Sequence, residues 1–142
     1  IPGHNDSDEE ITALSRWVLR ELGPDVPIHF SAFHPDHKMP DVPSTPLSTL
    51  VNARHIAMQE GLHYVYTGNV HHQEGDTTRC PTCRTVLIER DWYQIKRYRL
   101  SGHAQCPDCA ATVAGQFSDQ AGDFGRKRIP VSIARFANEK AL

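Results

Sequence analysis

The sequence predicts an α/β fold followed by a small β-ribbon that is held together by a metal ion. Strand-like and helix-like segments alternate over the first 70 residues, which implies right-handed crossovers and a parallel sheet. All four cysteines lie in two C-x-x-C pairs separated by 22 residues. The segment between the pairs is rich in β-branched and aromatic residues, which favours two short strands. A length of 142 residues with 39% hydrophobic residues suits one ordinary domain or two small ones.

The chain opens with a polar segment, residues 1–10, which is typical of a strand end followed by a loop. The first predicted helix begins within the last residues of this segment. Ser7 and Glu10 match the S-x-x-E capping box that begins a helix. Over Asp8–Leu22, apolar residues recur at helical spacing: Ile11, Leu14, Val18 and Leu22. The Gly23-Pro24 pair then ends the helix.

Two strands and a second helix are predicted next. Val26–Phe33 is a mostly apolar run of strand length, suited to burial on both faces. The proline-dense loop His34–Pro46 has 13 residues, a length that usually has a function or is disordered. A helix over Leu47–Glu60, closed by Gly61, and a strand over Leu62–Asn69 complete this part. Because two full strands cannot form a stable open α/β domain, we expect the chain to be a fragment of a larger fold.

The ribbon is predicted to follow a polar connection through His71, His72 and Gln73–Asp76. Its two strands lie within Thr85–Leu100 and are interrupted near Arg90–Asp91. Three aromatic side chains are expected to cover its small core: Trp92, Tyr93 and Tyr98. The remaining tail is loop-like, with one candidate strand over Ile129–Ile133.

The cysteine pairs predict a metal site formed by Cys80, Cys83, Cys106 and Cys109. A C-x-x-C turn can direct two thiolates at one point, and two such turns complete a tetrahedral S4 site. Structural zinc is the favoured metal, and rubredoxin-like iron is the main alternative. Free core thiols and disulfides are weaker readings, because the spacing is regular and no signal-peptide pattern is present at the start. Glycine would ease the tight turns, but Arg84 and Ala110 occupy the positions after each pair.

Composition and charge weigh against several classes of function. A net charge of −2 gives no general attraction to nucleic acid, and the basic residues of the ribbon are typical of a solvated face: Arg90, Lys96, Arg97 and Arg99. No apolar run approaches the roughly 20 residues that a membrane helix needs. Cysteines without disulfide partners suggest a reducing compartment, so we expect a cytoplasmic protein.

Several segments together resemble one known family. The segments are "IPGHNDSDEEI", "VPIHFSAFHPDHKM" and "GLHYVYTGNV", followed by the cysteine pairs joined through "LIERDWYQI" and "YRLSG". They resemble the C-terminal third of the radical S-adenosylmethionine enzyme of the AmmeMemoRadiSam system, which is related to pyruvate formate-lyase activating enzymes. The resemblance extends from Ile1 to about Phe117. It implies the last units of a partial (β/α)6 barrel over residues 1–70, a zinc ribbon over 71–117 and a tail over 118–142.

The resemblance also implies an activity for the intact protein. Family members bind a 4Fe-4S cluster and cleave S-adenosylmethionine to a 5′-deoxyadenosyl radical, and a partner protein is a candidate substrate. The family's C-x3-C-x2-C cluster motif is absent, since no cysteine precedes Cys80. We therefore expect this chain alone to be inactive. The alternative is a non-catalytic ribbon that binds protein or nucleic acid, and a C-x3-C-x2-C motif upstream would exclude it.

Candidate cofactor-binding residues follow from the barrel rule that chemistry takes place at the carboxyl ends of the strands. Asn5 and Asp6 follow one predicted strand, and His34 follows the next and is the best single candidate. Further positions at these ends are His37, Lys38, Thr67 and Asn69. A helix cap would explain Asn5 and Asp6 equally well, and the start of a turn would explain His34.

Overall fold

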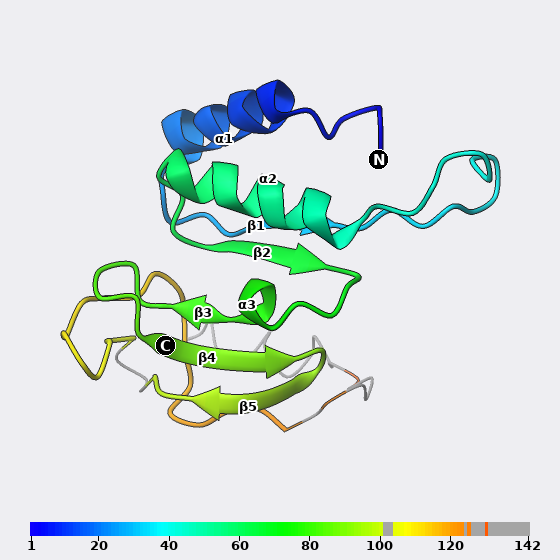
Figure 1. The fold of residues 1–142 in the computed structure, drawn as a ribbon. Helices are drawn as coiled ribbons and strands as arrows, with labels where there is room; N and C mark the ends of the chain where they lie inside the picture. The colour runs from blue at the N-terminus through cyan, green and yellow to red at the C-terminus, as the bar shows by residue number, and fades with distance from the viewer. Residues whose placement is uncertain (101–103, 124, 126–129, 131–142) are drawn as a thin grey trace, which may run out of the picture.

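The structure, a computed structural model, describes residues 1–100, 104–123, 125 and 130. It is a mixed α/β fold, as predicted, with two small sheets (Figure 1). Strands β1 (Ile28–Ser31) and β2 (Val65–Gly68) pair in parallel, from Ile28 opposite Val65 to Ser31 opposite Gly68. Helices α1 (Asp8–Leu22) and α2 (Leu47–Gln59) lie on one side of this pair, and the ribbon lies on the other.

The capping box at the start of α1 is confirmed. The N–H of Glu10 donates to Ser7 Oγ over 3.3 Å, and the Ser7 hydroxyl donates to the Glu10 carboxylate over 2.9 Å. Gly23, at φ 87°, ends the helix as expected. Before the helix, however, the N–H of His4 donates to the carbonyl of Ile1 over 3.0 Å. Residues 1–4 therefore form a turn, and the predicted strand end is wrong.

The core between helices and sheet explains the length and burial of β1. The buried residues Val18, Ala57, Leu62 and Val65 form this core, and Ile28 and Phe30 pack against it. The alternate side chains His29 and Ser31 are exposed, so the prediction that this strand is buried on both faces is wrong. Pairing stops at Ser31 because the backbone of Phe33 bonds to Thr45 instead. These two bonds close the base of the 34–46 loop.

The ribbon is a three-stranded antiparallel sheet in the order β3 (Thr78–Arg79), β4 (Val86–Asp91), β5 (Gln94–Tyr98). Helix α3 (Gln73–Asp76) lies where only a polar connection was predicted, and β3 was not predicted, because two to four residues are too few to show periodicity. The two strands predicted within residues 85–100 are confirmed as β4 and β5, with a register shift between Glu89 and Arg90 and a hairpin turn at Trp92–Tyr93, directly after the predicted interruption. The candidate strand at Ile129–Ile133 lies outside the described residues.

The ribbon core is shared with the first part of the chain. It contains Leu87, Ile88, Leu100 and Val113, the buried cysteines Cys80 and Cys106, and Tyr64. The Tyr64 hydroxyl accepts a hydrogen bond from the N–H of Ala114 over 3.3 Å. Of the three aromatic residues expected to cover the core, only Tyr98 packs against it. Trp92 and Tyr93 are 45% and 59% exposed, because the tip of the hairpin extends beyond the core.

No helix in the described part of the chain is both long enough and apolar enough to cross a membrane.

Candidate metal centre

Two matching turns, here called the knuckles, carry the four cysteines. In the first knuckle, residues 80–85, the N–H of Cys80 donates to the carbonyl of Thr85 over 2.9 Å, and the N–H of Arg84 donates to Cys80 over 3.0 Å. In the second, residues 106–111, Cys106 bonds to Ala111 and Ala110 bonds back to Cys106, both over 2.9 Å. The repeated pattern shows that both C-x-x-C sequences fold into the same turn.

The residue after each cysteine pair adopts the left-handed conformation. Arg84 has φ 64° and Ala110 has φ 60°. The sequence indicates that glycine would ease these two turns, and their backbone angles give the reason. Only glycine adopts the left-handed conformation without an energetic penalty.

Ala110→Gly is expected to stabilise the chain. Relief of the left-handed penalty contributes about 1 kcal/mol, and the extra entropy of glycine in the unfolded chain removes part of it. We expect a net gain of roughly 0.5 kcal/mol in the free energy of unfolding, measured by denaturant titration. Ala13→Gly, at an exposed position inside α1, is the matched control and should cost about 1 kcal/mol. A loss of stability in both variants would contradict the strain argument.

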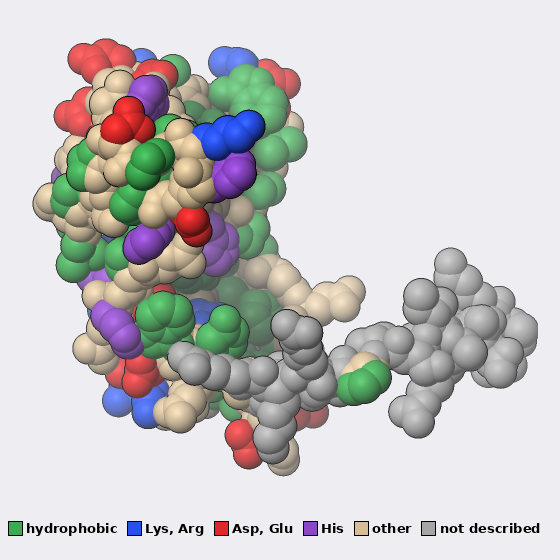
Figure 2. Space-filling model, turned by 90° about the vertical axis from the view of Figure 1, so that its right-hand side faces the viewer, with side chains coloured by type: hydrophobic (Ala, Val, Ile, Leu, Met, Phe, Trp, Pro, Cys, Tyr) green, Lys and Arg blue, Asp and Glu red, His purple; other side chains and the backbone are tan. Residues whose placement is uncertain are grey.

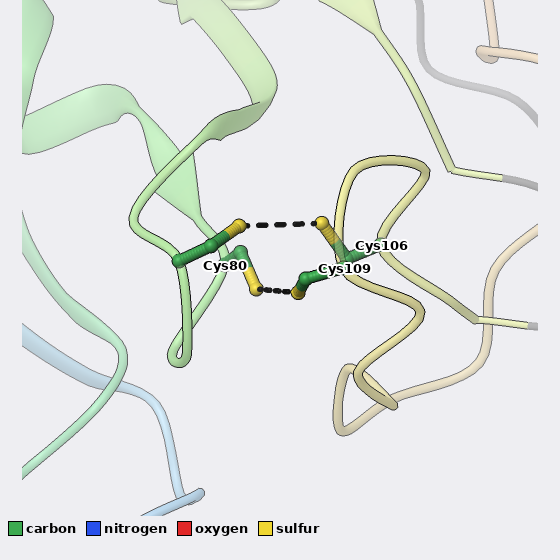
Figure 3. A group of neighbouring side chains, drawn as sticks. Cys80, Cys106 and Cys109 are labelled. Atoms are coloured by element: carbon green, nitrogen blue, oxygen red, sulfur yellow. Dashed lines mark hydrogen bonds between the residues drawn. The ribbon is translucent and has the colours of Figure 1, made fainter.

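The four sulfur atoms converge on one point. Cys80 Sγ lies 3.6 Å from Cys109 Sγ, Cys83 Sγ lies 3.6 Å from Cys106 Sγ, and all four lie within 4.8 Å of one another. Figure 3 shows the labelled sulfurs facing each other across the gap between the two knuckles. An ion held at about 2.3 Å in a tetrahedral thiolate site requires sulfur separations of about 3.8 Å. The four predicted cysteines are thus positioned to bind one metal ion.

The protonation states of the thiols favour a cation at this point. Burial opposes ionisation of Cys80, but the backbone N–H groups of Cys83 and Thr82 outweigh it and lower the pKa of this thiol to about 7. The N–H of Ala111 favours the Cys109 thiolate, yet burial and the neighbouring sulfurs raise its pKa to about 12. Without a cation the Cys109 thiol therefore resists ionisation beside the neighbouring sulfurs, and a divalent ion would remove that repulsion.

A polar network, here called the Arg99–Asp108 clamp, joins the two knuckles beside the sulfurs. Arg99 donates to the two carboxylate oxygens of Asp108 over 2.6 and 3.2 Å, and to Thr85 Oγ1 over 3.1 Å. The Thr85 hydroxyl donates to Asp108 over 2.6 Å. Hydrogen bonds from Arg99 and then Thr85 lower the pKa of the Asp108 carboxyl.

The clamp was not predicted from the sequence, which placed Arg99 among the basic residues on a solvent-exposed face of the ribbon. The partners of Arg99 lie 14 and 9 residues away, and only the folded ribbon brings them together. Because Arg99 carries a positive charge next to the cysteines, it also suits a centre whose four thiolates carry a net negative charge.

The candidate cofactor-binding residues lie apart from the metal centre. Figure 2 looks onto the side of the molecule where β1 and β2 end, and several histidine side chains gather there. Asn5 and Asp6 line a cavity of about 270 Å³ together with Phe33 and Thr45. Asp6 accepts a hydrogen bond from the N–H of Gly3 over 2.7 Å. His34 is exposed and is not among the residues that line this cavity. The structure therefore does not bring these three residues into one site.

A larger cleft, of about 720 Å³, lies between the open face of the β1–β2 pair and the ribbon. Its lining includes the candidates Thr67 and Asn69, and also residues that the sequence did not single out, such as His29, Tyr66 and Arg90. The rings of His29 and Tyr66 lie 5.0 Å apart, and the Arg90 guanidinium lies 5.9 Å from the centre of the Tyr66 ring. The alternation of polar and apolar residues in β1 was the signal that could have indicated this face.

Comparison with known proteins gives one similarity. The chain is 43% identical over 114 residues to the uncharacterized protein MJ0808 of Methanocaldococcus jannaschii. The match covers 80% of this chain and 34% of that protein, so the chain spans about a third of the length of the curated relative. No family model and no solved structure matches the chain.

Proposed function

We propose that Cys80, Cys83, Cys106 and Cys109 bind one structural zinc ion. The observation that carries this proposal is the convergence of four sulfurs at the separation that a single tetrahedral ion requires. Four thiolates fill the coordination shell and leave no position for substrate, which is typical of structural and not catalytic zinc. The ion would hold together a core that contains Cys80 and Cys106 themselves.

Metal analysis of the purified chain tests the zinc proposal. We expect one equivalent of zinc and, by X-ray absorption, metal–sulfur distances of about 2.3 Å. If the analysis found one equivalent of iron, the site would be assigned as a rubredoxin-like iron centre and not as a zinc site. A metal-free protein with all four thiols reactive would overturn the proposal.

We further propose that the intact protein is a radical S-adenosylmethionine enzyme, of which residues 1–70 form the last barrel units. The parallel pairing of β1 and β2, with helices on one side and polar side chains on the other, supports this proposal. The ordered resemblance across both parts of the chain supports it as well. In this proposal the intact enzyme cleaves S-adenosylmethionine reductively, and the resulting 5′-deoxyadenosyl radical abstracts hydrogen from a substrate, with a partner protein as the candidate.

The cysteines of this chain do not fit the catalytic cluster of such an enzyme. Their sulfurs lie within 4.8 Å of one another, which suits one ion and leaves no space for a cube of four irons and four sulfides. The ligands of the catalytic cluster would therefore lie elsewhere in the intact protein. Asn5 and Asp6, which line one cavity, and His34, which lies outside that cavity, remain the proposed cofactor-facing residues of this part.

One observation favours the alternative of a non-catalytic binding module. Trp92 and Tyr93 are exposed at the tip of the β4–β5 hairpin, and exposed aromatic side chains are enriched in protein interfaces. A C-x3-C-x2-C motif upstream in the same reading frame decides between the two proposals.

A further inference from the structure

We propose that the cysteine cluster is also a site of oxidative modification. In this proposal a hydroperoxide converts the four cysteines into two disulfides, Cys80–Cys109 and Cys83–Cys106, each of which joins one knuckle to the other. The release of zinc in this reaction depends on the proposal that the four cysteines bind zinc. The proposed disulfide pairing does not depend on it.

Each proposed disulfide combines one accessible sulfur with one buried sulfur. Cys83 and Cys109 are exposed, whereas Cys80 and Cys106 are 0% and 2% exposed. Each exposed cysteine lies 3.6 Å from the buried cysteine of the opposite knuckle. The oxidant therefore reaches Cys83 or Cys109 first, and a second thiol is already in place to react with the product (Figure 3).

The chemistry balances with the peroxide as the oxidant. The exposed sulfur attacks one peroxide oxygen and the O–O bond breaks. The sulfur becomes a sulfenic acid, and the other oxygen takes up a proton and leaves as water. The buried partner then attacks that sulfur, the S–S bond forms, and the hydroxyl group leaves as a second water. Two equivalents of hydrogen peroxide and four protons convert the zinc tetrathiolate into two disulfides, four waters and a free zinc ion.

The Arg99–Asp108 clamp favours pairing between the knuckles over pairing within each C-x-x-C turn. It joins the knuckles through protein contacts alone, so it does not depend on the ion. The buried cysteines are fixed as well, since Cys80 and Cys106 belong to one core with Leu87 and Val113. A disulfide needs the sulfurs to approach from 3.6 Å to about 2.05 Å, which is a small movement while the knuckles stay together. The oxidised ribbon would therefore stay closed without metal.

Peptide mapping gives the test, because trypsin separates the two knuckles. Cleavage after Arg79, Arg84, Arg99 and Arg126 yields one peptide with Cys80 and Cys83 and another with Cys106 and Cys109. The zinc-loaded chain is treated with hydrogen peroxide, alkylated and digested without reduction. We expect the two peptides joined, with fragmentation assigning Cys80 to Cys109 and Cys83 to Cys106. Separate peptides, each lighter by two hydrogens, would overturn the proposal, as would alkylated thiols or sulfinic acids alone.

A pair of variants tests the role of the clamp. Asp108→Ala removes every clamp hydrogen bond that joins the two knuckles and should shift the product from joined to separate peptides. Arg97→Met, at an exposed position of β5, should leave the joined product unchanged. An unchanged product in Asp108→Ala would show that the clamp does not direct the pairing. Zinc release is followed separately with a coloured chelator. If the chain contained no zinc before oxidation and still gave joined peptides, the metal proposal would be refuted and the proposed disulfide pairing would stand.

Discussion

Cys106→Ser is expected to abolish metal binding and to destabilise the ribbon by several kcal/mol. The free energy of binding a structural metal contributes directly to folding in small metal-bound modules. The ribbon depends on it strongly, because its sheet has three short strands and its core includes two of the ligands. The measurement is hydrogen exchange and limited proteolysis over residues 78–113, compared with the helices α1 and α2.

Cys109→Ser is the matched control for packing. Cys109 is exposed and Cys106 is buried, so the two variants remove the same kind of ligand from different environments. A role for the metal predicts that both variants lose protection in the ribbon. If only Cys106→Ser were destabilised, the effect would come from the core and not from the metal. Unchanged proteolytic resistance in both variants would contradict a structural metal.

The second large effect is the complete absence of 5′-deoxyadenosine formation by this chain. The reaction needs a low-potential 4Fe-4S cluster with three cysteine ligands and one iron left open to S-adenosylmethionine. The sequence contains four cysteines, and all of them converge on one point in the ribbon. We therefore expect no product from S-adenosylmethionine and reductant, even after iron–sulfur reconstitution.

The intact protein provides the comparison for this assay. If the proposed enzyme function is correct, the intact protein forms 5′-deoxyadenosine after reconstitution, and a variant without its C-x3-C-x2-C motif does not. Turnover by the 142-residue chain alone would show that the ribbon cysteines hold the catalytic cluster. An intact protein that binds a cluster and never cleaves S-adenosylmethionine would favour the binding-module proposal.

Local patterns in the sequence were sufficient to predict the longer elements. The helix Asp8–Leu22 has the predicted bounds, and α2 ends within one residue of its predicted end. Helix α1 has clear apolar spacing and a side-chain cap, and α2 lies between Pro46 and Gly61, so both sets of bounds depend on neighbouring residues only. The four metal-site cysteines were predictable for the same reason, since each C-x-x-C turn is a local structure.

The tertiary structure decided everything that depends on contacts between distant residues. Phe33 was expected in a strand, yet its backbone bonds to Thr45 across the loop. Tyr64 completes the ribbon core, although it precedes the ribbon in sequence, while Trp92 extends into solvent. Arg99, interpreted as a surface charge, joins the two knuckles. The sequence by itself determined the two long helices, the alternation of strand and helix segments, and the four cysteines that could bind a metal ion, because local spacing encodes them. The shared core, the clamp and the pairing of the sulfurs depend on chain segments that meet only in the folded protein.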